Sequence, residues 1–167
     1  MIVREATPAE YEEVGELRIA AYIAGGFMSP QSGYAPVLAA LGTDGDGQVL
    51  VAVDEGQILG TVMLQPVSPD EPPPPEQRWV SSADEAEIRA LAVTPDGQGR
   101  GTGRALLQAV TDYAAQSGVK HLVLCTQPDM LAARHLYEQA GFTRLPERDW
   151  GASGITLLAY GRILPGQ

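Results

Sequence analysis

The segment from Glu87 to Leu107 constrains the fold most strongly, because a strand, a glycine-rich turn and an amphipathic helix follow one another directly in it. The turn reads Gln-Gly-Arg-Gly-Thr-Gly-Arg over residues 98–104. A turn of this kind at the start of a helix presents several backbone N–H groups to one point, at the positive end of the helix dipole. Three alternating glycines are conformationally costly unless the main chain needs the space. The segment therefore predicts a site for a diphosphate group, in preference to a turn without a ligand.

Two familiar nucleotide-binding motifs do not fit this turn. A Walker P-loop ends in Gly-Lys-Ser/Thr, whereas this sequence continues Gly-Arg-Ala from residue 103. The dinucleotide fingerprint Gly-x-Gly-x-x-Gly fails in every register, because its last glycine would fall on a threonine, an arginine or a leucine. What remains is Gln98-x-x-Gly101-x-Gly103, in which the side chains of Gln98 and Arg100 add hydrogen-bond donors to those of the main chain.

Hydrophobic periodicity divides the rest of the chain into strands and helices. Strands are predicted at 2–6, 49–53, 58–64, 85–93 and 121–126, and a final hairpin at 142–145 and 155–160, joined through Trp150. Helices are predicted after a capping box at Thr7 to Glu10, at 35–41, between the glycine turn and Gly118, and at 131–140. Four prolines at 72–75 predict an exposed loop over 67–77. Helices between strands, with a hairpin at each end, indicate an α/β domain with a mixed sheet.

Composition and charge exclude several classes of function. A formal net charge of −10 argues against a nucleic-acid backbone or an anionic membrane as the main partner. The single cysteine, Cys125, excludes an internal disulfide framework and indicates a reducing compartment. Without an apolar leader or a membrane-length apolar run, the chain is expected to be soluble and cytoplasmic. His121 and His135 stand apart from other ligand types, so no metal site is expected.

The order of these elements and two spaced motifs resemble the GNAT family of N-acetyltransferases. The motifs are Gln98-x-x-Gly101-x-Gly103 and the later segment Ala133-x-x-Leu136-Tyr137-x-x-x-Gly141-Phe142. The resemblance covers nearly the whole chain and implies a single N-acetyltransferase domain over residues 1–167, with a mixed, mostly antiparallel sheet flanked by helices. It also implies an enzyme that transfers an acetyl group from acetyl-CoA to a primary amine, on a small molecule or a peptide, by direct attack in a ternary complex.

The resemblance assigns roles to particular residues. It places the CoA pyrophosphate on the main-chain amides of Gln98, Gly99, Arg100, Gly101, Thr102, Gly103 and Arg104. It places the pantetheine arm along the strand edge at Leu91, Ala92 and Val93, where one amide would stabilise the oxyanion formed on attack. Tyr137 matches the tyrosine that lies near the sulfur and protonates the leaving thiolate. Glu87 matches the strand glutamate that serves some members as general base.

The chemistry of acetyl transfer asks for the same groups. An alkyl amine is protonated at neutral pH, so a carboxylate beside the thioester must take its proton before attack. Burial against the sheet would raise the pKa of Glu87 towards the useful range. A thiolate is already a tolerable leaving group, so Tyr137 is expected to help without being indispensable. Met130 stands where many family members carry an asparagine, which affects the amide contacts expected for the cofactor.

Each assignment has an alternative. Glu87 shares its strand face with Glu85 and Arg89 and could belong to a solvated row of charges, and Tyr137 could be a core residue of its helix. Cys125 is expected to be a small buried hydrophobe and not a nucleophile. For the whole protein, a non-catalytic acyl-CoA-binding or sensing module is the alternative function. A succinyl donor is a weaker alternative, for which Arg89 is the only obvious cation. The sequence specifies neither the identity of the acceptor nor the oligomeric state, for which a homodimer is one alternative.

Overall fold

The computed structural model describes residues 1–45, 47–66, 84–152 and 155–165. The chain divides into two compact units, the first formed by Met1–Leu64 with Ala90–Val110 and the second by Gln65–Arg89 with Thr111–Gln167. Strand β4 (Glu85–Val93) therefore passes from the second unit into the first between Arg89 and Ala90.

The first unit is built on antiparallel strands in the order β1-β2-β3-β4. Strand β1 (Ile2–Glu5) pairs with β2 (Gln48–Asp54), and β2 pairs with β3 (Gln57–Pro66). Two residues, Glu55 and Gly56, join β2 to β3, with φ angles of 51° and 77°. Two consecutive left-handed residues are what the tightest hairpin turn requires, because they match the twist of the strands. The predicted hairpin is confirmed.

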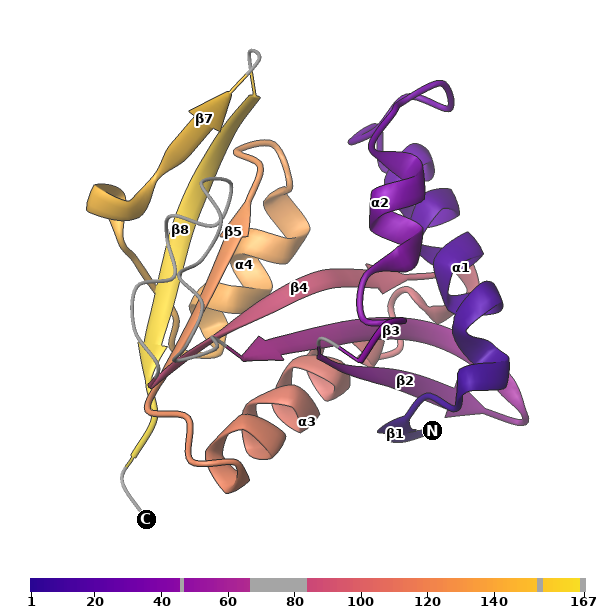
Figure 1. The fold of residues 1–167 in the computed structure, drawn as a ribbon, viewed down its shortest axis with the longest axis horizontal. Helices are drawn as coiled ribbons and strands as arrows, with labels where there is room; N and C mark the ends of the chain where they lie inside the picture. The colour runs from indigo at the N-terminus through magenta and orange to yellow at the C-terminus, as the bar shows by residue number, and fades with distance from the viewer. Residues whose placement is uncertain (46, 67–83, 153–154, 166–167) are drawn as a thin grey trace. The chain divides into compact units, whose positions relative to one another are not determined.

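Helices cover both faces of this part of the sheet (Figure 1). A short 3-10 turn, η1 (Pro8–Glu10), leads into α1 (Tyr11–Ala24), and α2 (Ala35–Ala40) follows. The predicted capping box is present, since the Glu10 carboxylate accepts from the Thr7 N–H at 2.9 Å. Val14 and Leu17 of α1 pack against one face of the sheet. On the other face, α3 (Thr102–Gln116) lies so close that a Cβ added at Gly60 would come within 2.9 Å of the Leu106 side chain.

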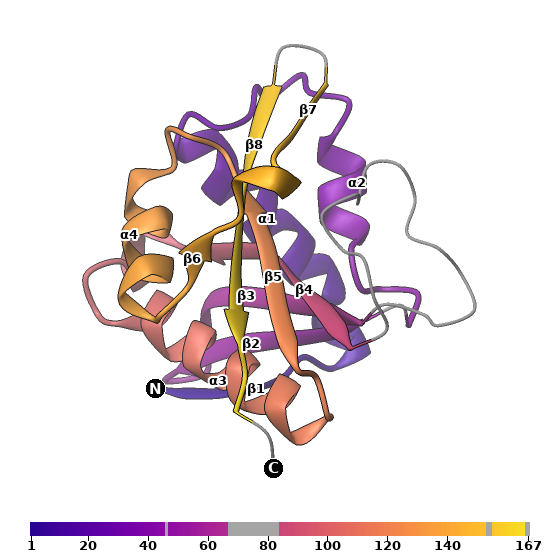
Figure 2. The ribbon, with the colours of Figure 1, turned by 90° about the vertical axis from the view of Figure 1, so that its left-hand side faces the viewer.

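The second unit contains the strand order β4-β5-β8-β6, with β7 paired to β8 (Figure 2). Strand β5 (His121–Thr126) is parallel to β4, whereas β8 (Ile155–Ile163) runs antiparallel to β5, to β6 (Thr143–Arg144) and to β7 (Trp150–Ala152). Helix α4 (Leu131–Gln139) precedes β6, and a 3-10 turn, η4 (Pro146–Arg148), precedes β7. One parallel pair among antiparallel ones confirms the predicted mixed, mostly antiparallel sheet.

Two details of the second unit differ from the sequence prediction. The expected hairpin of 142–145 with 155–160 is a three-strand arrangement: β6 pairs with Tyr160 and Gly161, while Trp150 begins a separate strand opposite Leu157. The turn at η4 breaks the chain between the two strands, and periodicity did not reveal it. On α4, helical spacing predicts a buried face of Ala133, Leu136, Tyr137 and Ala140. Of these four residues Tyr137 is buried, and the other three are half-buried. The proline-rich loop predicted over 67–77 lies outside the described residues.

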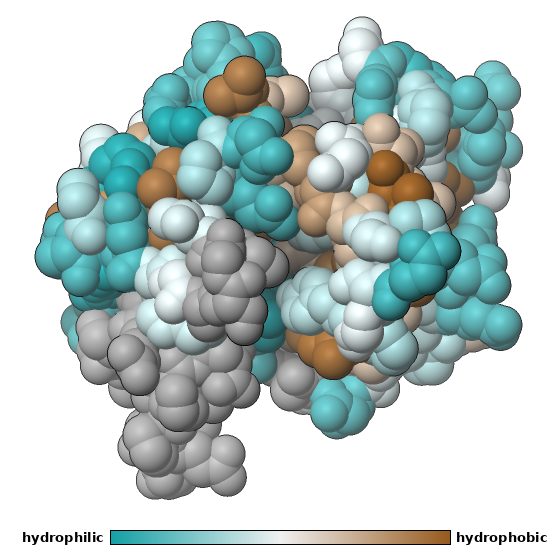
Figure 3. All heavy atoms as spheres, turned by 90° about the horizontal axis from the view of Figure 1, so that it is seen from above, coloured by the Kyte–Doolittle hydropathy of each residue, from teal (hydrophilic) through white to brown (hydrophobic). Residues whose placement is uncertain are grey.

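The surface carries few large hydrophobic side chains. In the view of Figure 3 hydrophilic residues dominate and hydrophobic ones form small groups. The exposed large hydrophobic residues of the described chain are Met1, Ile2, Tyr34, Val37, Leu131 and Ile163. Single exposed residues of this kind are ordinary on proteins and identify no binding surface. In the described ranges, no helix has the length and apolar character needed to cross a membrane.

Candidate active site

The glycine-rich turn is anchored to strand β3. Between β4 and the turn lies a 3-10 segment, η3 (Pro95–Gly97). The Thr94 hydroxyl donates to the Leu59 carbonyl oxygen at 3.1 Å and accepts from the Gly97 N–H at 3.1 Å. A Cβ at Gly97 would lie 2.7 Å from the Leu59 oxygen, so only glycine fits there. The start of the turn is therefore fixed to the sheet of the first unit.

Beyond this anchor the backbone changes its conformation at every second residue. Gly99 and Gly101 have φ angles of 74° and 77°, whereas Arg100 between them has a negative φ. Such alternation turns successive N–H groups towards a common point and forms a concavity suited to anions. A Cβ at Gly99 or Gly101 would meet no atom within 4 Å, so both backbones border open space. These two glycines allow the conformation and leave the approach to the main chain clear.

Helix α3 begins directly after the turn, at Thr102. Its first intrahelical bond runs from the Ala105 N–H to the Gly101 carbonyl oxygen at 2.9 Å. The amides of the first helical turn have no acceptor within the helix, because none precedes them at the required spacing. The N–H groups of Thr102 and Gly103, at the start of the helix, therefore extend the same donor array. The main-chain amide of Gln98, which was also predicted to bind the pyrophosphate, instead donates to the Pro95 carbonyl oxygen at 3.3 Å.

Side chains of the turn contribute less than the sequence suggested. Thr102 is buried, and its hydroxyl donates to the Gly97 carbonyl oxygen at 2.8 Å, which closes the turn on itself. The Arg100 guanidinium forms an ion pair with Asp54 at the end of β2. Gln98 and Arg104 are exposed. The main chain is thus the principal source of donors around Gly99 and Gly101.

Glu87 of β4 is a buried carboxylate and not part of a solvated row. Its side chain is 4% exposed, and Oε1 lies 3.5 Å from Nε of Arg89. Arg89 in turn donates from Nη1 to Oε1 of Gln65 at 3.0 Å. The neighbouring Glu85 is also buried and accepts two hydrogen bonds from Arg148, at 2.6 and 3.1 Å. Glu85 is thus held by Arg148, whereas the cation beside Glu87 is Arg89.

Strand β4 is irregular immediately after Arg89. Its pairing with β5 covers Glu85–Ile88 opposite His121–Leu124. At Ala90 the backbone adopts a φ of 54°. A left-handed conformation costs a non-glycine residue of order 1–3 kcal/mol, and such strain is concentrated at functional sites. The irregularity precedes Leu91, Ala92 and Val93, the predicted pantetheine edge. Sequence reasoning missed it, because the alternation from 85 to 93 is regular and alanine does not mark a turn.

Tyr137 and the Gly141-Phe142 pair form one structural unit at the end of α4. Gly141 has a φ of 91°, and the Phe142 N–H donates to the Tyr137 carbonyl oxygen at 3.0 Å. This bond is the one that defines a Schellman motif, which ends the helix. The two aromatic rings also contact each other, with centroids 6.1 Å apart. Tyr137 also contacts Tyr160, with ring centroids 6.3 Å apart. The spacing of the motif therefore has a physical cause in how α4 ends.

Cys125 of β5 lies two residues beyond the partner of Glu87 in the β4–β5 register. Burial raises the pKa of its thiol well above the ordinary value, and the Glu87 and Asp149 carboxylates raise it further. The group is therefore a neutral thiol at physiological pH, in agreement with the expectation that it is not a nucleophile.

Met130 occupies the N-cap of α4, where no side chain caps the helix. Its sulfur accepts from the Thr126 hydroxyl at 3.3 Å. In the part of the chain that the structure describes, no group of three His, Cys, Asp or Glu side chains could hold a metal ion.

The predicted site residues divide between the two units. Glu87, Arg89, Cys125 and Tyr137 belong to the second unit, whereas residues 91–93 and 98–104 belong to the first. The continuous strand β4 carries Glu87 four residues ahead of Leu91. Sequence reasoning did not single out Gln65 and Tyr160, which contact Arg89 and Tyr137; each carries no motif of its own.

Comparison with known proteins gives the class. The model of the Acetyltransferase (GNAT) family matches residues 11–142, so this chain belongs to the GNAT acetyltransferase family.

Individual relatives are consistent with this membership. The chain is 34% identical over 94 residues to the uncharacterized N-acetyltransferase YhfO of Bacillus subtilis, an alignment that covers 56% of this chain and 57% of the relative. It is 42% identical over 67 residues to a mycothiol acetyltransferase of Beutenbergia cavernae, covering 39% of this chain and 23% of that protein. The chain thus spans little more than half of the first relative and a quarter or less of the second.

Among solved structures, the fold is similar to that of yncA, a proposed acetyltransferase of Salmonella typhimurium solved with its cofactor acetyl-CoA. The TM-score is 0.72, with 19% identity and coverage of 99% of this chain and 95% of the other. At this identity the similarity concerns the fold.

Proposed function

We propose that residues 1–167 form a single N-acetyltransferase domain, which transfers an acetyl group from acetyl-CoA to a primary amine. The observation that carries the proposal is the donor array formed by the alternating turn at Gly99–Gly101 and the first turn of α3. The family match across residues 11–142 supports the same function. The acceptor is specified only as an amine, because one relative is uncharacterized and the chain spans 23% of the mycothiol acetyltransferase.

The residues present fit acetyl-CoA. A pyrophosphate needs converging N–H donors and an unobstructed backbone, and both properties meet at Gly99 and Gly101, next to the start of α3. The edge at Leu91–Val93 lies on the same strand as Glu87 and would hold the pantetheine arm. When bound, acetyl-CoA supplies the thioester carbonyl that an amine attacks. Met130 replaces the common asparagine, so its contribution would be apolar.

Glu87 takes the proton from the acceptor ammonium, directly or through one water. Its burial removes competing solvent, while the Arg89 guanidinium at 3.5 Å favours the charged carboxylate that a base must be. The amine nitrogen then forms the new C–N bond as the C–S bond breaks, and it loses its second proton as the amide forms. That proton balances the one that Tyr137 gives to the thiolate, and Tyr137 regains its proton through solvent. An amide N–H near Leu91 or Ala92 stabilises the negative charge that grows on the carbonyl oxygen.

Tyr137 supplies the proton that the leaving thiolate takes up. It is the most exposed of three packed aromatic residues, at 6% against 2% for Phe142 and 0% for Tyr160. Direct transfer needs no covalent acyl-enzyme, in agreement with the neutral thiol of Cys125.

A non-catalytic acyl-CoA-binding module is the alternative, and one experiment separates the two. Acetyl-CoA binding is measured by calorimetry, and amine-dependent release of CoA is measured with a panel of small amines and amino-terminal peptides. The proposal predicts binding together with release by at least one amine. Binding without release across a broad panel supports the module, and the absence of binding contradicts both.

A further inference from the structure

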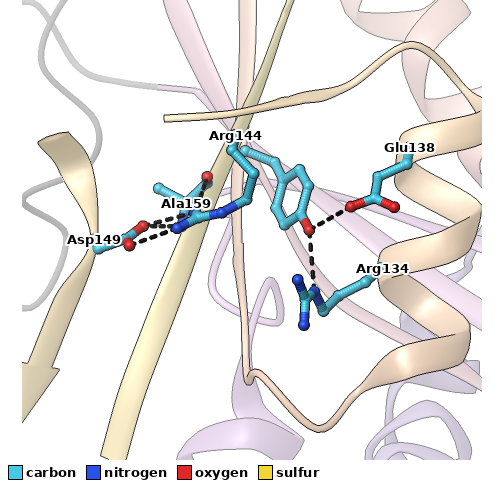
Figure 4. Close-up of polar contacts among 6 residues, drawn as sticks. Arg134, Glu138, Arg144, Asp149 and Ala159 are labelled. Carbon is cyan, nitrogen blue, oxygen red and sulfur yellow. Dashed lines mark hydrogen bonds and ion pairs between the residues drawn. The ribbon is translucent and has the colours of Figure 1, made fainter. Parts of the chain in front are cut away.

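Tyr160 of β8 holds the helix that carries Tyr137. Its side chain is fully buried, and two residues of α4 that Figure 4 labels, Arg134 and Glu138, are hydrogen-bonded to its hydroxyl. It accepts from Nε of Arg134 at 3.1 Å and donates to Oε2 of Glu138 at 2.9 Å. Arg134 and Glu138 are four residues apart, so they lie on the same side of the helix, one turn from each other. The buried hydroxyl of Tyr160 is thus hydrogen-bonded to two side chains that are one full turn apart on α4.

The other side of the Tyr160 ring is held by a second set of contacts. The Arg144 guanidinium carbon lies 5.4 Å from the ring centroid, within the range of a cation–π contact. Arg144 pairs with Asp149 through two hydrogen bonds of 2.7 and 2.6 Å and donates to the Ala159 carbonyl oxygen at 2.7 Å. Asp149 also accepts from the Ala159 N–H at 2.8 Å. The ring is thereby fixed to β6, to β8 and to Asp149, the residue that precedes β7.

The hydroxyl of Tyr160 cannot itself serve as a catalytic acid. It is inaccessible to solvent, and its proton is donated to Glu138. The Tyr137 ring packs against the Tyr160 ring, with centroids 6.3 Å apart. In sequence Tyr137 lies between Arg134 and Glu138, the two α4 residues that are hydrogen-bonded to the Tyr160 hydroxyl. Any rotation or shift of α4 on β8 therefore moves the Tyr137 hydroxyl.

We infer that Tyr160 is a positioning residue, which sets the place of the Tyr137 hydroxyl through its two hydrogen bonds to Arg134 and Glu138 of α4. This inference rests on the proposed function, since it assumes that Tyr137 acts in acetyl transfer. Loss of the Tyr160 hydroxyl should lower kcat roughly three- to tenfold, because small displacements of a reacting group are costly. The KM for acetyl-CoA should stay within about twofold, since the pyrophosphate turn lies on another unit of the chain.

The test is a double-mutant cycle with Tyr160→Phe and Tyr137→Phe. If Tyr160 acts through Tyr137, the Tyr160→Phe change should lower kcat in the wild-type background and have no further effect in the Tyr137→Phe background. Tyr113→Phe, which removes a phenol hydroxyl from half-buried Tyr113 on α3, is the matched control and should leave kcat unchanged. Glu138→Ala removes the acceptor at an exposed position and should lower kcat in the same way, even if Tyr160→Phe folds poorly.

The possible outcomes are distinct. An unchanged kcat in both Tyr160→Phe and Glu138→Ala overturns the inference. The proposed function is not affected by that result, provided that the wild-type protein is active. Equal losses in both backgrounds also overturn it, because they show a structural effect independent of Tyr137. A wild type that binds acetyl-CoA but acetylates no amine contradicts the proposed function itself and, with it, the inference.

Discussion

Oε1 of Glu87 lies 3.5 Å from Nε of Arg89, two residues further along β4. The Glu87 side chain is 4% exposed and the Arg89 side chain 20%, so the carboxylate is buried while the guanidinium is partly accessible to solvent. A buried carboxylate beside one cation can stay charged and still accept a proton, as a general base must.

Replacement of Glu87 by Gln keeps the size of the side chain and removes its basicity. We expect the turnover rate to fall by about a hundredfold or more, with the greatest loss at low pH, where most of the amine is protonated. The measurement is a profile of kcat/KM against pH for both proteins. A profile of unchanged shape and height would remove Glu87 as the base.

Replacement of Arg89 by Gln removes the cation that favours the charged form of Glu87. A larger share of the base would then be protonated at a given pH, so the acid limb of the pH–rate profile should move to higher pH. Arg162→Gln removes a cation from β8 and is the control, with no shift expected. Equal shifts in both variants would attribute the effect to net charge alone.

A side chain at Gly101 should block the pyrophosphate site without unfolding the chain. Gly101 and Gly118 have φ angles of 77° and 84°, and a Cβ at either position meets open space. Glutamate therefore costs about the same backbone strain at both, roughly 1–2 kcal/mol. Gly101→Glu should reduce acetyl-CoA affinity at least a hundredfold, because it brings a carboxylate to an anion site, whereas Gly118→Glu should bind normally. Calorimetric titration of both variants checks this, and equal affinities would contradict the assignment.

Cys125 should be dispensable for transfer. Burial and two neighbouring carboxylates raise the pKa of its thiol, so the thiolate needed for nucleophilic attack is scarce at neutral pH. We expect Cys125→Ala to keep kcat within about threefold and the wild-type protein to form no acetylated enzyme with acetyl-CoA alone. Intact-protein mass spectrometry checks the second point, and an acetyl group carried by Cys125 would establish a two-step mechanism instead.

The Arg144–Asp149 pair predicts how stability depends on pH. Hydrogen bonds from Arg144, and then from the Ala159 amide, hold the pKa of Asp149 below its ordinary value of 3.8. A depressed carboxyl pKa stabilises the fold above the unfolded-state pKa, and this contribution is lost as the pH falls through the folded-state pKa. Asp149→Asn should therefore lower the free energy of unfolding by roughly 1–3 kcal/mol at pH 7.

The difference between Asp149→Asn and wild type should shrink once the pH falls below the ordinary carboxyl pKa. Urea unfolding at several pH values measures it, with the exposed Asp129→Asn as control. A difference that stays constant down to acid pH would assign the loss to packing and not to charge.

Much of the fold could be predicted from the sequence because its signals are local. The Glu55-Gly56 turn, the capping box at Glu10 and the Gly141 helix end are each specified by a few adjacent residues. The unit that joins Tyr137 to Phe142 is local in the same sense. Motifs that arise from helix and turn geometry are visible without tertiary information.

The remaining features depend on residues that are distant in sequence. No local sequence signal marks the left-handed backbone of Ala90, because the residues around it alternate in side-chain type as in an ordinary strand. The burial of Glu87 follows from its place in the sheet, and the bonds from Tyr160 to α4 join residues 22 and 26 apart. Periodicity indicates which face of a strand a residue occupies but not which groups cover that face.

The most direct test of acetyl transfer is to measure the acetylated amine and free CoA together, starting from acetyl-CoA and a panel of primary amines. We expect the wild-type protein to form the two products in equal amounts with at least one amine, Gly101→Glu to form neither, and Glu87→Gln to form both far more slowly. Release of CoA without an acetylated amine, or equal product formation by wild type and Gly101→Glu, would contradict the proposed acetyl transfer.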